Sequence, residues 1–252
     1  MSILVSISFD DGNENHFTEF YPILEDYGLK ATFYVITSLL GKKGMLNKYH
    51  LKELYNHGNE IGSHTHPHPN LTRLSTDSLV LELSKSKEIL KKFGCTTMAY
   101  PYGYCDGRCI YYAKRFYSAA RGYGKKDYGI NRPEALNLYS LKMLPTQQFI
   151  SNHSFPEGLA IFVFHGKFSI SFDLILWFLR NKRVEFLRRK ALHNSLVRIK
   201  DSVFKSSRSV NKSDSLTQFR NLCDFLSAND SVKVRTISDA LKDLGLIDNQ
   251  EA

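Results

Sequence analysis

Residues 3–12 read Ile-Leu-Val-Ser-Ile-Ser-Phe-Asp-Asp-Gly, an apolar stretch that ends in two carboxylates and a glycine. Apolar and small polar side chains alternate over Ile3–Phe9, which predicts a strand. In a continuing strand the side chains of Asp10 and Asp11 would point in opposite directions, but a turn at Gly12 would aim both into one cleft. Taken alone, Asp-Asp-Gly favours the simpler interpretation of an Asx turn or a helix cap.

Working outward from this stretch, strand and helix patterns alternate along the chain. The predicted strands cover 3–9, 31–36, 60–63, 97–100, 159–164 and 233–236. The predicted helices cover 13–27, 47–57, 76–93, 106–119 and 238–244. This alternation indicates parallel pairing and an α/β architecture. A chain of 252 residues matches the usual size of an α/β barrel, so we expect a single domain over 1–252.

Three histidines follow the strand predicted at 60–63, in the sequence His64-Thr65-His66-Pro67-His68. Gly62 and Pro67 indicate a turn rather than a helix interior. A lone histidine is more often structural, but three within five residues favour a metal site completed by a carboxylate from elsewhere. His66 stays ambiguous, because it could face solvent or a substrate instead.

A fourth histidine, His165, follows the late strand in the sequence Phe162-Val-Phe-His-Gly. All of these motifs stand at the C-terminal end of a predicted strand, where α/β barrels place their active sites. Imidazole can carry a proton near neutral pH, so His165 is a candidate proton donor. The alternative is a core histidine whose hydrogen bonds are satisfied.

Four short motifs together resemble the polysaccharide deacetylases with a NodB homology domain, carbohydrate esterase family four. They are Asp10-Asp11-Gly12, His64-Thr65-x-x-His68, Tyr100-Pro101-Tyr102-Gly103 and Phe164-His165-Gly166. The resemblance runs in order from about Ile3 to His165. It implies a distorted (β/α) barrel of the NodB type with about seven parallel strands.

The resemblance also implies a metal centre. Asp11, His64 and His68 would bind a divalent ion, and Thr65 would hydrogen-bond within its loop and fix the histidines. Two imidazoles and a carboxylate with an open position suit zinc, and cobalt, nickel or iron are also compatible. Such a centre suits metal-assisted hydrolysis.

The resemblance implies three further catalytic roles. Asp10 would be the general base, the backbone N–H of Tyr102 would help to hold the oxyanion, and His165 would be the general acid that protonates the departing amine. An amine leaves poorly unless it is protonated, which explains why a second proton-transfer group is needed.

Two departures from the family pattern stand out. Most members have an Arg-x-Pro-Tyr motif whose arginine contacts the catalytic aspartate, and Ala99 takes the place of that arginine here. The motif that orients the catalytic histidine is not recognisable, and the only tryptophan, Trp177, lies downstream of His165. The sequence therefore leaves open what sets the basicity of Asp10 and which residue orients His165.

The activity expected from these residues is removal of an N-acetyl group from an amino sugar in an oligosaccharide, a glycan precursor or a lipid-linked sugar. A deformylase or an O-acetyl esterase would share the same metal chemistry. A third alternative is a non-catalytic glycan-binding domain on the same fold, which the two departures would favour.

The basic residues of the chain are concentrated in one segment. Between Lys167 and Lys212 twelve Lys or Arg stand against three acids, a balance equal to the net charge of +9 for the whole chain. We expect a basic helical insertion over 168–212. Its part over 174–205 could contact an anionic membrane, or it could pack on the barrel as a hairpin with a solvated basic face. No motif predicts nucleic-acid binding.

Location and assembly are only weakly constrained. The chain enters its first predicted strand without a signal-peptide pattern, and it has no apolar run of about 18 residues. We therefore expect a cytoplasmic protein, associated with the cytoplasmic face of the membrane if the basic segment binds there. The oligomeric state is left open.

Overall fold

The computed structural model describes residues 3–122, 130–131, 138–139, 141–142, 158–165 and 212–248. The chain divides into two units, residues 1–167 together with 220–252, and residues 168–219. The predicted basic insertion over 168–212, including the segment 174–205, lies outside the described residues apart from Lys212. The sheet and the motifs that follow its strands belong to the first unit.

Seven strands form one sheet in the described part of the chain, and all of their pairings are parallel. They are β1 (Ile3–Phe9), β2 (Thr32–Val35), β3 (Glu60–Ser63), β4 (Thr97–Ala99), β5 (Ala119–Arg121), β6 (Leu159–Phe164) and β7 (Val232–Val234). The order is β5-β4-β3-β2-β1-β6, with β7 also paired to β1. The predicted α/β fold with about seven parallel strands is confirmed.

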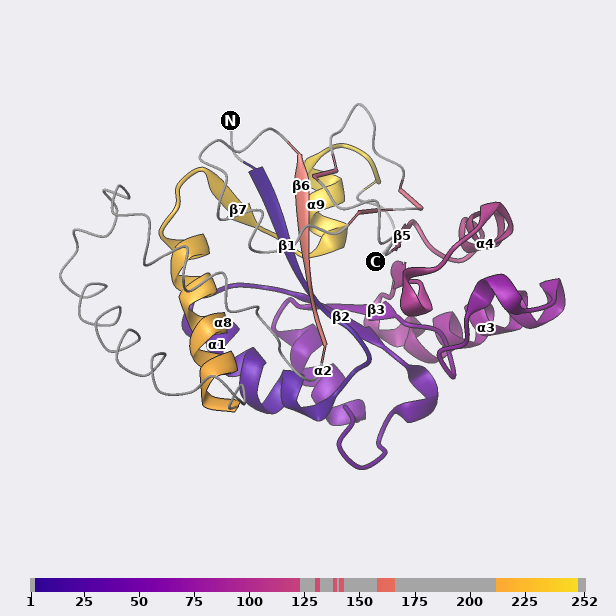
Figure 1. Cartoon of the computed structure of the whole chain (residues 1–252), viewed down its shortest axis with the longest axis horizontal. Helices are drawn as coiled ribbons and strands as arrows, with labels where there is room; N and C mark the ends of the chain where they lie inside the picture. Colours follow the sequence, from indigo (N-terminus) through magenta and orange to yellow (C-terminus); the bar gives the residue numbers. More distant parts are fainter. Residues whose placement is uncertain are drawn as a thin grey trace, which may run out of the picture. The chain divides into compact units, whose positions relative to one another are not determined.

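The central strand β1 explains how the sheet curls. It runs beside β6 from Leu4 to Phe9 (Figure 1). Its other edge is shared, because its first residues, Ile3–Val5, pair with β7 and its last, Ser8 and Phe9, pair with β2. Two strands that diverge from one edge bend the sheet into part of a barrel, as expected for a distorted barrel. Every residue of β1 is buried, as in parallel sheets covered on both faces.

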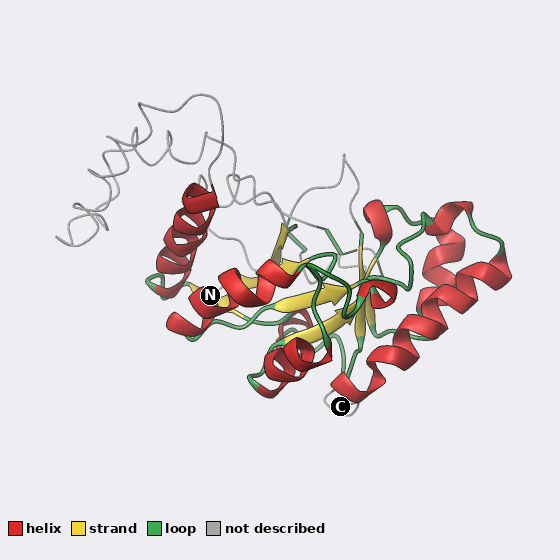
Figure 2. Cartoon of the chain, turned by 90° about the horizontal axis from the view of Figure 1, so that it is seen from below, coloured by secondary structure: helices red, strands yellow, loops and turns green. Residues whose placement is uncertain are grey.

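Helices follow most of the strands and lie outside the sheet (Figure 2). The α-helices are α1 (Tyr21–Asp26), α2 (Lys48–Asn56), α3 (Thr76–Leu90), α4 (Gly107–Ala113), α8 (Lys212–Ser227) and α9 (Ile237–Asp243). A π-helical turn, η1 (His16–Phe20), precedes α1. Short 3-10 turns are η2 (Thr37–Leu39), η3 (Leu71–Arg73), η4 (Lys91–Phe93) and η5 (Pro101–Gly103). None of the helices in the described ranges combines the length and apolarity needed to cross a bilayer.

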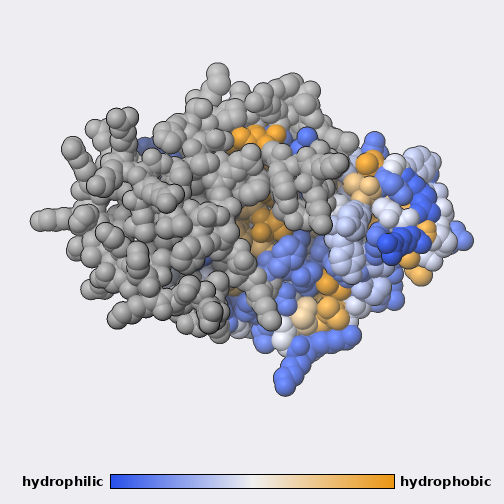
Figure 3. Space-filling view, in the orientation of Figure 1, coloured by the Kyte–Doolittle hydropathy of each residue, from blue (hydrophilic) through white to orange (hydrophobic). Residues whose placement is uncertain are grey.

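Helices α2, α3 and α9 begin at side-chain caps and bury apolar residues. The Asn47 side chain accepts a hydrogen bond from the backbone N–H of His50 (3.0 Å), and Ser75 and Thr236 cap α3 and α9 in the same way. In α3 the buried residues Leu79, Leu83 and Leu90 share one face. Hydrophilic residues predominate on the outward face of α3 and α4 in Figure 3, as in amphipathic helices that cover a core.

One predicted helix boundary is wrong. The helix predicted over 106–119 ends at Ala113, and residues 119–121, Ala-Ala-Arg, form β5 beside β4. Alanine and arginine favour helix in isolation, but pairing with β4 overrides that weak preference. The helix predicted over 76–93 is confirmed, with a last 3-10 turn that ends at the left-handed Gly94.

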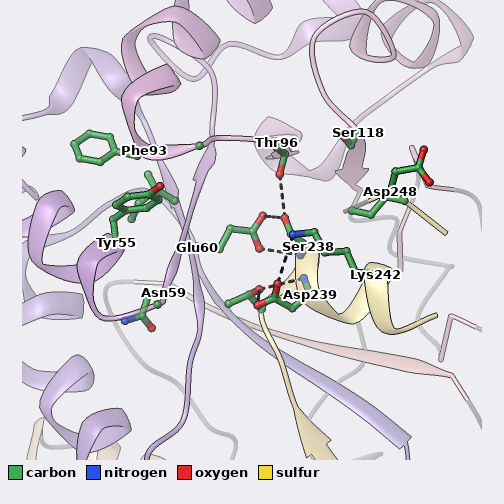
Figure 4. A pocket seen from close by; sticks show the side chains of 15 residues that line it. Tyr55, Asn59, Glu60, Phe93, Thr96, Ser118, Ser238, Asp239, Lys242 and Asp248 are labelled. Carbon is green, nitrogen blue, oxygen red and sulfur yellow. Dashed lines mark hydrogen bonds and ion pairs between the residues drawn. The ribbon is translucent and has the colours of Figure 1, made fainter. Parts of the chain in front are cut away.

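A hydrogen-bond network holds the N-terminal ends of the strands together. Glu60 of β3 accepts hydrogen bonds from the hydroxyls of Thr32 in β2 (2.8 Å) and Thr97 in β4 (2.5 Å). It also accepts from the backbone N–H (3.0 Å) and hydroxyl (2.6 Å) of Ser238 in α9. Figure 4 shows Glu60 and Ser238 beside a pocket at this end. This network fixes the frame that carries the opposite, C-terminal ends of the strands.

Candidate metal centre and active site

Asp10 and Asp11 stand where β1 ends. The backbone N–H of Asp10 still donates to the Phe164 carbonyl of β6 (2.8 Å), so Asp10 continues the strand. The chain then turns through left-handed backbone at Asp11 (φ 74°) and Gly12 (φ 76°). The predicted turn at Gly12 is confirmed, and through it both carboxylates reach the same group of histidines.

His64 and His68 stand on the loop that follows β3. His64 is buried, and its Nδ1 lies 2.8 Å from the Ala99 carbonyl of β4. Because a carbonyl only accepts, Nδ1 carries the hydrogen and Nε2 is left as the ring's lone-pair nitrogen. The loop passes through left-handed backbone at His68 (φ 65°), and Nε2 of His68 comes to 3.1 Å from Nε2 of His64.

Asp11, His64 and His68 form a cluster that could hold a metal ion, with ligand atoms all within 4.8 Å of one another. Oδ1 of Asp11 lies 3.6 Å from Nε2 of His64 and 3.8 Å from Nε2 of His68. Ligand atoms about 2.1 Å from a tetrahedral zinc ion lie about 3.4 Å apart, so these separations fit a divalent ion. One carboxylate and two imidazoles are a donor set that suits such an ion. The hydrogen bond from His64 to the Ala99 carbonyl fixes the orientation of the imidazole, as is usual for metal-ligating histidines.

The electrostatic surroundings keep both imidazoles neutral. Burial lowers the pKa of His64, even though the nearby carboxylate of Asp10 favours its charged form. Burial, together with repulsion by His64, lowers the pKa of His68 to about 4. Neutral imidazole is the form that binds metals, so the site is prepared for a cation at neutral pH.

The third histidine of the motif lies outside the cluster. Nδ1 of His66 lies 3.0 Å from the Thr37 hydroxyl, and its backbone N–H donates to Glu82 (3.1 Å). His66 is therefore not part of the cluster formed by Asp11, His64 and His68. Thr65 hydrogen-bonds through its backbone: its N–H donates to the nearby Ser63 hydroxyl (3.2 Å), and its carbonyl accepts from the N–H of Thr37 in η2 (3.1 Å). Its buried hydroxyl has no partner in the described residues.

Asp10 is surrounded by cations and imidazoles. Nη2 of Arg121, the last residue of β5, lies 2.6 Å from its Oδ1 and 2.5 Å from its Oδ2. Burial alone would raise the pKa of Asp10, but the charge and hydrogen bond of Arg121 outweigh it, and the pKa is lowered. Asp10 is therefore an ionised carboxylate at neutral pH.

His165 follows β6 directly, at the same end of the sheet. Its Nε2 lies 3.7 Å from Oδ2 of Asp10, and its side chain is 58% exposed. The interpretation of His165 as a core histidine is therefore wrong. Gly166 and Trp177 lie outside the described residues.

Tyr102 borders the cluster from the turn after β4. Its backbone is left-handed (φ 57°, ψ 8°), and its ring centroid lies 4.6 Å from that of His68. The side chain is 57% exposed, so the residue forms part of the open rim of the site.

Backbone strain is concentrated at this site. In the described part of the chain four non-glycine residues have positive φ, and they are Asp11, Thr65, His68 and Tyr102. All four lie on the loops that follow β1, β3 and β4. Such conformations cost energy and persist where the surrounding structure imposes them, which is typical of functional sites.

Sequence reasoning did not single out Arg121. The signal that could have found it is the combination of a buried carboxylate, which needs a cation, with alanine at position 99 where the family places an arginine. Gly62 lies within β3, as predicted for 60–63, and the histidines follow on a loop rather than a helix. A Cβ at Gly62 would lie 2.4 Å from the ring of Tyr34, so this glycine makes room for that ring.

Comparisons with known proteins find relatives of this chain. Residues 2–118 match the family model described as polysaccharide deacetylase. The poly-β-1,6-N-acetyl-D-glucosamine N-deacetylase of Staphylococcus aureus is 35% identical over 116 residues, which cover 39% of this chain and 40% of that protein. The chain thus matches well under half the length of this curated relative.

Solved structures extend the comparison. The Streptococcus pyogenes deacetylase PplD, solved in complex with acetate, is 29% identical with a TM-score of 0.51, over 57% of this chain and 68% of that one. The Xyl-CE4 domain of a xylanase from the hindgut metagenome of Trinervitermes trinervoides has a TM-score of 0.55 over 100% of this chain and 95% of that one. At 15% identity this second likeness shows the fold alone.

Proposed function

The chain belongs to the polysaccharide deacetylase family, and from that premise we propose that it is a metal-dependent hydrolase that removes the N-acetyl group of an amino sugar. The observation that carries the proposal is the meeting of Asp11, His64 and His68 in one cluster, with Asp10 and His165 beside it. Three ligands leave room for water and substrate on a divalent ion.

Asp11, His64 and His68 would hold the ion. Zinc suits this donor set, and cobalt, nickel and iron are compatible with it. A divalent ion in this position supplies Lewis acidity, which polarises the acyl oxygen and acidifies the attacking water.

Asp10 would act as the general base. Its ion pair with Arg121 keeps it ionised at neutral pH, so it can accept a proton from the attacking water. In support of this role, Oδ2 of Asp10 lies 4.0 Å from Nε2 of His64, so the carboxylate is directly beside the cluster.

His165 would act as the general acid. It lies at the exposed rim of the site, within 3.7 Å of Asp10, where a proton taken up by the carboxylate can be passed on to the leaving amine. Protonated amine leaves readily, whereas an amide anion does not.

The backbone N–H of Tyr102 would help to stabilise the oxyanion. The residue is held in a left-handed conformation on the turn beside His68, and a fixed N–H at such a point costs no reorganisation when negative charge develops. The exposed ring of Tyr102 would border the sugar.

The proposed substrate is an N-acetylated glucosamine polymer or oligomer, by analogy with the relative from Staphylococcus aureus. A lipid-linked amino sugar or a glycan precursor would present the same acetamide. A deformylase or an O-acetyl esterase would use the same residues. The glycan-binding alternative loses one of its two supports, because Asp10 has an arginine partner despite Ala99.

The test is acetate release from β-1,6- and β-1,4-linked N-acetylglucosamine oligomers and from a lipid-linked N-acetylhexosamine, beside N-formyl and O-acetyl analogues. Each substrate is assayed with added zinc or cobalt and after chelation. The proposal expects metal-dependent acetate from at least one N-acetylated substrate. Release of formate alone would identify a deformylase, and release of acetate from the O-acetyl analogue alone would identify an esterase. No release from any metal-loaded sample would contradict hydrolysis.

A further inference from the structure

Arg121 is a buried cation whose guanidinium reaches across the inside of the curled sheet. It stands at the end of β5, is 2% exposed, and contacts both carboxylate oxygens of Asp10 on β1. Removing one partner of a buried ion pair leaves the other charge uncompensated, so this pair constrains both side chains strongly.

The register of the sheet relates Arg121 to Ala99. In the parallel pair of β4 and β5, Ala99 and Arg121 are partners. Register partners on neighbouring strands turn their side chains to the same face, so these two point into the same interior space. Ala99 is buried and fills little of that space, while its carbonyl accepts the hydrogen bond from His64. Its short side chain leaves room for Arg121.

An aromatic ring supports the guanidinium on its way to Asp10. The guanidinium carbon of Arg121 lies 5.3 Å from the ring centroid of Tyr34 in β2. That ring in turn occupies the space that a Cβ at Gly62 would take. A cation over an aromatic face is attracted to it and loses freedom of orientation. The guanidinium is thereby fixed between Tyr34 and Asp10.

We propose that Arg121 is the positioning residue of Asp10. An arginine at either position 99 or position 121 can supply the guanidinium that orients this carboxylate. The inference rests on the proposed function, because it assigns Arg121 a part in setting the proposed base. Nη2 of Arg121 contacts both carboxylate oxygens, and Oδ2, which lies 2.5 Å from it, also faces His64 (4.0 Å) and His165 (3.7 Å). Two long side chains at 99 and 121 would compete for the same interior space.

The test compares Arg121→Ala, Arg121→Lys, Ala99→Arg and the double variant Ala99→Arg/Arg121→Ala. Readouts are kcat, KM and the thermal unfolding midpoint, with and without free guanidinium ion far below unfolding concentrations. Arg115→Ala, which removes an exposed arginine bonded to Tyr111, is the matched control.

In Arg121→Ala we expect kcat to fall about 100-fold, as for misplacement of a catalytic group, while KM stays close to the wild-type value. Free guanidinium should restore part of that loss in Arg121→Ala and leave the wild type and Arg115→Ala unchanged. The double variant should be more active and more stable than Arg121→Ala. Ala99→Arg alone should be less stable than the wild type.

Wild-type kcat in Arg121→Ala would overturn the inference. A loss of kcat that neither guanidinium nor arginine at 99 reverses would also overturn it, because the role of Arg121 would then be structural only. If Arg121→Ala does not fold, the double variant Ala99→Arg/Arg121→Ala is the deciding sample. Its failure to fold would likewise overturn the inference. A wild type without activity on any substrate would contradict the proposed function instead, and the unfolding midpoints would still show whether arginine at 99 replaces Arg121.

Discussion

Asp10 shows how a single residue is set by opposing physical effects. Burial favours its neutral form, and the ion pair with Arg121 favours its charged form and prevails. The sequence predicted Asp10, Asp11, His64, His68 and His165 as a group, because each follows a predicted strand and belongs to a motif of the family that the chain resembles. It did not predict Arg121, because nothing local marks a residue whose partner lies 111 positions away.

The role of Asp10 can be tested by Asp10→Asn. The amide cannot accept the proton of the attacking water, so we expect turnover to fall by about 100-fold or more. Metal binding should persist, because Asp11, His64 and His68 are unchanged. Acetate release and metal content are measured on the same sample, and undiminished turnover would rule out Asp10 as the base.

His16 should make the fold sensitive to acid. It is buried beside Phe9, its ring nitrogens have no partner in the described residues, and burial lowers its pKa to about 3. Between about pH 6.5 and 3 the unfolded chain binds a proton here that the folded chain does not. The free energy of unfolding therefore falls as the pH falls through this window, by up to about 1.4 kcal/mol per pH unit for this group.

The corresponding variant is His16→Leu, followed by denaturant unfolding at pH 7.5, 6, 5 and 4. The difference in unfolding free energy between variant and wild type should shift in favour of the variant as the pH falls. A difference that stays constant over this range would show that His16 does not titrate on unfolding.

At the scale of elements, strand ends determine the site. The loops after β1 and β3 carry the three residues of the candidate metal cluster, and the loop after β4 carries Tyr102. All three loops contain residues with left-handed backbone. Strand existence was predictable from alternation, and β1, β3 and β6 have the predicted bounds. The short β5 was missed, because Ala-Ala-Arg carries no strand signal and depends on pairing with β4.

Gly62→Ala should disturb two neighbouring strands at once. The new Cβ would overlap the Tyr34 ring, which must shift and displace Arg121. We expect a loss of stability of about 1–3 kcal/mol, with a fall in kcat. Gly107→Ala is the control, because a Cβ there meets nothing within 4 Å. Unfolding midpoint and kcat are measured for both, and wild-type values for Gly62→Ala would refute the packing argument.

Glu60→Gln should separate stability from activity. In the variant an NH₂ group replaces one carboxylate oxygen, and it cannot accept the hydrogen bonds that this oxygen accepts from Thr32, Thr97 or Ser238. We therefore expect the free energy of unfolding to fall by about 1–3 kcal/mol. Glu88→Gln, at an exposed position of α3, is the control. Because the network lies at the end of the sheet opposite the site, kcat below the unfolding transition should stay at the wild-type value. A stability equal to the control's would contradict the structural role of Glu60.

At the scale of the whole molecule, the parallel sheet brings distant motifs to one edge. Motifs near residues 10, 64, 102 and 165 meet because the C-terminal ends of parallel strands lie together. This rule made it predictable that the motifs meet at one edge, while the resemblance to the polysaccharide deacetylases implied the role of each residue. The exact contacts were not, because they depend on how β2 and β7 share one edge of β1 and curl the sheet.

The central claim is that Asp11, His64 and His68 form one divalent metal site, and calorimetric titration of the metal-free protein with zinc tests it most directly. We predict one ion per chain, with affinity reduced about 100-fold or more in His68→Gln. His66→Gln, two residues away but directed to Thr37, should bind as the wild type does. Equal affinities for the wild type and His68→Gln, or loss of binding in His66→Gln alone, would contradict the account.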